Sequence, residues 1–171
     1  GIGPALQMVE LRTLMRTRLQ RSDDLIGVIE EINGLLCQDL PEEMFISLFL
    51  AAIDVSSRRL RHIGAGHRAW VLRADECLQL DATGVVLGLL KPVTFQEVDT
   101  PPLRSGDILL INTDGVTEAV SEQKEMFGQQ RLHEAVALSR RRSAREILDC
   151  IFEAVERFVG ATPARDDMTV V

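Results

Sequence analysis

The spacing of the apolar residues changes twice along this chain, and that change restricts the fold more than any other feature. In the first part, apolar residues recur every three or four positions, which predicts amphipathic helices over 4–20 and from Ser22 or Asp23 to about residue 38. In the middle, the apolar runs become short and continuous, separated by Gly, Pro and charged residues, which is typical of β-strands. Helical spacing returns from about residue 129.

The middle region predicts antiparallel sheets. The expected strands are 44–54, 59–63, 69–73, 77–80, 93–99 and 107–112, and a last strand begins at 168–171. The segment 44–54 is apolar on both faces, as in a central strand, and "GAGH" (64–67) is typical of a tight hairpin turn. Because short connections favour antiparallel pairing, we expect an α+β fold in which sheet packs on sheet and the helices lie outside.

The last helix has a specific start signal. Ser143 and Glu146 have the spacing of a capping box, in which each side chain bonds to the backbone N–H of the other residue. After them, Ile147, Ile151 and Val155 recur at helical spacing, so we expect a helix with one buried face.

Composition excludes several classes of function. The 171 residues, 46% of them apolar, fit one globular domain, which we expect to span 1–171 without a second domain. A net charge of −7 argues against non-specific nucleic-acid binding. No apolar run reaches the roughly 18 residues of a membrane-spanning helix. Cys37, Cys77 and Cys150 lie far apart, which favours buried thiols in a reducing, cytoplasmic setting.

Aspartates occur next to two of the expected strands. Asp114 follows the expected strand 107–112, and Asp166 and Asp167 precede the last strand. Carboxylates that converge repel one another unless a cation neutralises them, and Mg²⁺ and Mn²⁺ prefer carboxylate oxygens. Gly115 would keep the approach to Asp114 open. On spacing alone, a plain turn and a charged loop explain these residues equally well.

An ordered set of motifs resembles the SpoIIE-type branch of the PPM metal-dependent protein serine/threonine phosphatases. The resemblance runs through nearly the whole chain, and "SGDILLINTDGVTEA" is its most specific piece. The matching segments, in order, are "GIGPALQM" (1–8), "MFISLFLAAID" (44–54), "GAGH" (64–67), "GVVLG" (84–88), "SGDILLINTDGVTEA" (105–119), "MFGQQRL" (126–132) and "RDDMTVV" (165–171).

This resemblance implies a PPM-type α-β-β-α sandwich of mainly antiparallel sheets, lacking its first strands, and an active site with two Mn²⁺ or Mg²⁺ ions. By position in the motifs, Asp114 and Asp166 are expected to be metal ligands, with Gly115, Asp167 and His67 in supporting roles. The resemblance implies no catalytic side chain, because a water activated by the metals is the nucleophile. Glu118 lies within the motif but receives no role.

The sequence also departs from the family pattern. Ser47 stands for the usual Thr, Gly64 stands for the usual Asn, and the first metal-binding Asp would fall just before Gly1. We therefore expect a domain truncated at both ends, with weak or no activity as it stands. The alternative is a catalytically degenerate module that binds a phosphoprotein or transmits a signal.

Partners are implied by the resemblance alone. Phosphatases of this branch commonly act on phosphoserine in STAS-domain proteins, the antagonists of anti-sigma factors. An upstream sensory or receiver domain and a homodimer are further expectations. The helices expected over 4–38 resemble the regulatory helix pair of the family.

Overall fold

The computed structural model describes residues 2–41, 43–164 and 166–171. Gly1, Glu42 and Arg165 lie outside the described residues. The chain forms two compact units, the first made of residues 1–68 and 80–103 and the second of residues 69–79 and 104–171. Each unit has its own sheet, its own helices and its own apolar core. None of the described helices is both long and apolar enough to cross a membrane.

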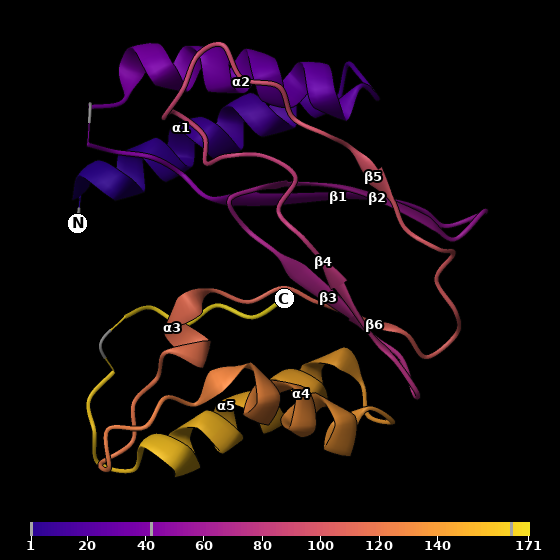
Figure 1. The fold of residues 1–171 in the computed structure, drawn as a ribbon, viewed down its shortest axis with the longest axis vertical. Helices are drawn as coiled ribbons and strands as arrows, with labels where there is room; N and C mark the ends of the chain where they lie inside the picture. The colour runs from indigo at the N-terminus through magenta and orange to yellow at the C-terminus, as the bar shows by residue number, and fades with distance from the viewer. Residues whose placement is uncertain (1, 42, 165) are drawn as a thin grey trace. The chain divides into compact units, whose positions relative to one another are not determined.

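The first unit packs two helices on one face of a sheet (Figure 1). Its elements are α1 (Ile2–Leu19), α2 (Leu25–Asp39), β1 (Leu48–Asp54), β2 (Arg59–Ala65) and β5 (Val98–Asp99), with the strand order β1-β2-β5. Ile29, Ile32 and Leu36 of α2 are fully buried against the side chains of β2 that face the helices. The two helices are confirmed, but α2 begins one residue later than expected. Its N-cap is Asp24, whose carboxylate accepts a hydrogen bond of 3.0 Å from the N–H of Gly27.

Two expectations about these strands were wrong. The segment expected as a central strand forms β1 at the edge of its sheet, and every residue of β1 is at least partly exposed. The hairpin joins β1 to β2 rather than β2 to the next strand. Its turn is held by Asp54, whose carboxylate accepts hydrogen bonds from the Ser56 and Ser57 hydroxyls at 2.6 and 2.7 Å. These bonds lower the pKa of Asp54 far below its ordinary value.

The "GAGH" segment is a crossover between two sheets and not a hairpin turn. β2 ends at Ala65, and the strand that follows it belongs to the other sheet. The backbone of Gly64 and Gly66 instead bonds to Gly84, through N–H···O=C contacts of 3.0 Å. A Cβ at Gly64 would collide with the carbonyl oxygen of His67 and lie 2.8 Å from the Cα of Ala82. Small residues are needed here because another loop passes against the backbone.

The second unit also packs helices on a sheet. Its elements are β3 (Ala69–Leu72), β4 (Cys77–Leu80), β6 (Ile108–Leu110), α3 (Asp114–Thr117), α4 (Gly128–Ser139) and α5 (Ala144–Val159), with the strand order β4-β3-β6. β3 and β6 are antiparallel, with Val71 opposite Leu109. The core holds Leu110 of the sheet, Leu132 of α4 and Ile151 of α5, and α4 and α5 lie side by side (Figure 1).

The last residues of the chain pair with the segment after β6. The N–H groups of Ile111 and Val171 each donate to the carbonyl of the other residue, at 3.0 and 2.8 Å. Thr113 N–H donates to the Thr169 carbonyl at 3.0 Å. The expected last strand is thus present as a short antiparallel pairing. This pairing fixes where Asp114, Asp166 and Asp167 stand.

The capping box at the start of α5 is confirmed, and it predicts a pH-dependent stability. The Ser143 hydroxyl and N–H donate to the Glu146 carboxylate at 2.6 and 2.9 Å, and these bonds lower the pKa of Glu146 below its ordinary 4.5. The stabilisation is complete above the unfolded pKa and is lost as pH falls through the folded one. We expect Ser143→Ala to flatten the dependence of the thermal unfolding midpoint on pH between about pH 6 and pH 3.

Ser105→Ala is the matched control, because Ser105 is an exposed loop serine. It should leave the pH dependence of the wild type unchanged. Identical pH profiles for Ser143→Ala and the wild type would contradict the prediction.

Candidate functional site

Asp114 is the first residue of α3, a single helical turn that follows the paired segment 111–113. Its carboxylate oxygen Oδ1 accepts a hydrogen bond of 3.0 Å from the N–H of Gly115, and its carbonyl accepts one of 2.7 Å from the N–H of Glu118. The side chain is exposed. Asp114 therefore presents a carboxylate to solvent from a fixed turn. The strand expected over 107–112 would end two residues before Asp114, but β6 ends earlier, at Leu110.

Asp166 repeats this arrangement on the C-terminal segment. Its Oδ1 accepts a hydrogen bond of 2.8 Å from the N–H of Asp167, and both side chains are exposed. In each case one carboxylate oxygen binds the next backbone N–H, which orients the side chain while it remains open to solvent.

Gly115 brings these two segments into direct contact. It is buried, and a Cβ at this position would collide with the carbonyl oxygen of Asp167 and lie 3.0 Å from its carbonyl carbon. The same Cβ would be 3.5 Å from the carbonyl carbon of Asp166. The glycine is thus required by close approach of the chain. Asp114 and the Asp166–Asp167 pair are brought together because no side chain separates their backbones.

Thr113 links the segments through its side chain, although it was not among the residues expected at the site. It occupies the N-cap of α3, yet its hydroxyl makes no capping bond. Instead Oγ1 accepts from the N–H of Thr169 at 2.9 Å and donates to the Asp167 carbonyl at 3.3 Å. A threonine directly before Asp114 was the available signal, but helix capping would have been the usual explanation.

A small cavity of about 130 Å³ lies beside the contact. Gly115, Glu118 and Asp166 line it, and Met126 and Met168 contribute apolar surface. Glu118 is exposed and belongs to the same turn as Asp114. Carboxylate oxygens are the ligands that Mg²⁺ and Mn²⁺ prefer, so the donor chemistry fits such an ion. The described residues contain no group of three or more His, Cys, Asp or Glu side chains placed to hold a metal.

His67 belongs to the first unit, whereas Asp114, Gly115, Asp166 and Asp167 belong to the second. It follows β2 and is half-buried. The structure therefore brings four of the five expected site residues together within the second unit, and the fifth, His67, belongs to the first unit.

Comparisons with known proteins agree with the motifs. The family model described as Stage II sporulation protein E (SpoIIE) matches residues 1–171. Protein IcfG of Synechocystis is 37% identical over 131 residues, which cover 75% of this chain and 20% of IcfG. Phosphoserine phosphatase RsbU of Bacillus subtilis is 26% identical over 176 residues, which cover 100% of this chain and 51% of RsbU. The chain thus spans about half or less of these two relatives.

The solved SiaA-PP2C domain of Pseudomonas aeruginosa has a similar fold, with a TM-score of 0.85 and 20% sequence identity. The match covers 99% of this chain and 68% of that one. This likeness confirms the predicted fold class, that of the PPM phosphatases. Because the family model spans every motif on which the resemblance rested, the chain belongs to the SpoIIE family, a branch of the PPM phosphatases.

Proposed function

We propose that this chain is a metal-dependent protein serine/threonine phosphatase that hydrolyses phosphoserine on a STAS-type regulatory protein. The observation that carries the proposal is the contact of Gly115 with Asp167, which holds two exposed aspartate-bearing turns against each other. Membership of the SpoIIE family and similarity to a phosphoserine phosphatase support it. In this proposal residues 1–171 act as a single phosphatase domain.

Each residue of the contact has a proposed role. Asp114 and Asp166 are the proposed ligands of Mn²⁺ or Mg²⁺, since each has an exposed carboxylate oriented by one hydrogen bond. Gly115 and Asp167 support them by fixing the distance between the two turns, and His67 keeps the supporting role that its motif gives it. When bound, a divalent cation supplies Lewis-acid stabilisation of the phosphoryl oxygens and makes water a stronger nucleophile near pH 7.

The exposure of both carboxylates suits a macromolecular substrate. A phosphoserine on the surface of a folded protein can reach a site only where the site itself is open. Asp114 and Asp166 lie on exposed turns and not at the bottom of a deep cavity. This openness favours a phosphoprotein over a small phosphate ester that needs an enclosing pocket.

A second candidate is a module that binds a phosphoprotein without hydrolysing it. It is favoured by the lack, among the described residues, of three metal-ligating side chains in one group. The two candidates differ in turnover and not in binding. A module of this kind would retain a phosphorylated STAS protein and leave its phosphate intact.

The metal ligands can be tested by Asp114→Asn and Asp166→Asn, alone and together, in the protein that carries this chain. Each change replaces a charged oxygen ligand with a neutral amide, so Mn²⁺ affinity measured by calorimetry should fall. The Mn²⁺-dependent release of phosphate from a phosphorylated STAS protein should fall by about a hundredfold or more.

Asp149→Asn is the matched control, because Asp149 is an exposed carboxylate of α5 paired with Arg145. It should leave both quantities unchanged. Hydrolysis that survives the double substitution would overturn the assignment, whereas binding of the phosphoprotein by a wild type that never turns it over would establish the second candidate.

Gly115→Ala tests the contact itself. The added methyl group would collide with the Asp167 carbonyl, so the turns must separate. We expect the free energy of unfolding to fall by about 1–3 kcal/mol and Mn²⁺ affinity to fall with it. Gly3→Ala is the control, since a Cβ at that helical position meets nothing nearer than 4.0 Å. A Gly115→Ala protein with unchanged stability and unchanged Mn²⁺ affinity would contradict the proposed role of the contact.

A further inference from the structure

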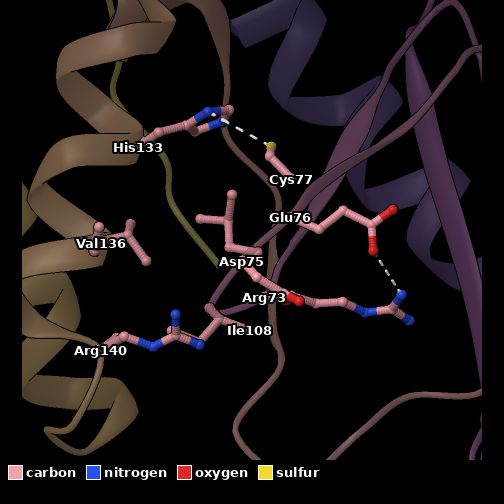
Figure 2. Close-up of a pocket in the computed structure, with 10 residues that line it drawn as sticks. Arg73, Asp75, Glu76, Cys77, Ile108, His133, Val136 and Arg140 are labelled. Atoms are coloured by element: carbon pink, nitrogen blue, oxygen red, sulfur yellow. Dashed lines mark hydrogen bonds and ion pairs between the residues drawn. The ribbon is translucent and has the colours of Figure 1, made fainter.

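A second cavity, of about 220 Å³, lies in the second unit between α4 and the turn that joins β3 to β4 (Figure 2). Its apolar wall includes Leu72, Ile108 and Val136. Cys77 and His133 lie next to each other in the lining of this cavity (Figure 2). Arg140 lines the cavity farther from them (Figure 2). None of these residues belongs to the proposed phosphatase site.

Cys77, His133 and Gln129 form a chain of side-chain contacts. Cys77 is exposed, so the expectation of three buried thiols was wrong for this residue. Its Sγ lies 3.7 Å from Nδ1 of His133. The side-chain amide nitrogen of Gln129 lies 2.8 Å from Nε2, on the other side of the imidazole. Trp70 meets the imidazole edge to face, with ring centroids 4.7 Å apart. A thiol, a base in reach of it and a group that orients the base are the three parts of an activated nucleophile.

Both members of the pair are neutral near pH 7, because burial lowers the pKa of His133 and raises the pKa of Cys77. These shifts disfavour a free thiolate, so the support comes from the contact between Sγ and Nδ1, through which the imidazole can accept the proton as the sulfur attacks. For Nδ1 to accept a proton, Nε2 must carry a hydrogen before and after the transfer, so the Gln129 amide must present its oxygen to Nε2, which rotation about its last bond allows. Four charged side chains line the same cavity: Arg73, Asp75, Glu76 and Arg140.

The other cysteines have different surroundings. Cys37 is half-buried, and its thiol donates to the Leu90 carbonyl at 3.5 Å. Cys150 is half-buried and accepts a hydrogen bond of 3.2 Å from Arg142. Neither contact supplies a base, whereas Cys77 has both a base and a cavity able to receive what becomes attached to the sulfur.

We propose that Cys77 is a modification site that forms mixed disulfides with small disulfides. His133 Nδ1 takes the proton of the thiol, and the thiolate attacks one sulfur of the disulfide R–S–S–R. The S–S bond of the reagent breaks as the bond between Cys77 and the attacked sulfur forms. The leaving thiolate R–S⁻ takes the proton from the imidazolium and departs as R–SH. The group R then occupies the cavity lined by Ile108 and Val136.

The test uses the chain with Cys37→Ser and Cys150→Ser, so that Cys77 is the reacting thiol. The protein is treated with 2-hydroxyethyl disulfide at pH 7, and the mixed disulfide is followed by intact mass. Burial alone would make folded Cys77 react more slowly than the same cysteine in denaturant. The proposed base instead predicts a folded protein that reacts about tenfold faster than the unfolded one.

His133→Phe removes the base and keeps a ring against Trp70. The rate at pH 7 should fall about tenfold, and the remaining rate should follow the ionisation of the thiol alone as pH rises. A smaller loss is expected for Gln129→Leu. Its control is Gln130→Leu, since Gln130 contacts Glu134 on the exposed side of α4.

Two results would overturn the proposal. One is a folded Cys77 that reacts no faster than the unfolded chain. The other is an unchanged rate and pH profile in His133→Phe. If His133→Phe does not fold, the comparison of Gln129→Leu with Gln130→Leu decides, because equal rates in these two variants would exclude an oriented base.

Discussion

The close approach of Gly115 to the Asp167 carbonyl is the constraint on which the candidate site depends. Neither aspartate turn is positioned by the sheet alone, because β6 ends at Leu110, before the first turn begins. The turns are held by backbone pairing after β6, by the Thr113 hydroxyl and by the absence of a side chain at residue 115. A site built in this way depends on main-chain geometry, and any atom added between the two segments displaces a carboxylate.

The sequence predicted those parts of the fold that short-range physics determines. The helix α5 has a capping box within its first turn and an apolar stripe at one spacing, so both its start and its buried face follow from neighbouring residues. The buried face of α2 also follows from neighbouring residues, because its buried residues recur on one side of the helix. Its N-cap was expected at Ser22 or Asp23 and lies at Asp24, because all three are good capping residues and only the hydrogen bond from the Gly27 N–H in the structure distinguishes them.

Neighbouring residues did not predict which strands pair with each other. "GAGH" has the composition of a tight turn, yet its glycines accommodate the segment near Gly84, which lies far along the chain. The true turn was held by Asp54 with Ser56 and Ser57, a local signal that was overlooked. At the site, the aspartates were singled out by their positions beside apolar segments, the family motifs supplied their expected roles, and their convergence required the structure. Thr113 was missed because its hydroxyl serves a contact across the fold and not the helix that it begins.

The pairing of Thr113 with Thr169 also has a consequence for the order in which this unit folds during synthesis. The hydroxyl bond between them spans 56 positions of the sequence. On a ribosome, α4 and α5 can pack together as soon as both have emerged, because they are neighbours in sequence. Asp166 follows α5 in the sequence, so it leaves the ribosome after both helices. A nascent chain can thus pack these helices before Asp166 meets Asp114. The two carboxylates come together only when residues 166–171 have emerged and paired with residues 111–113.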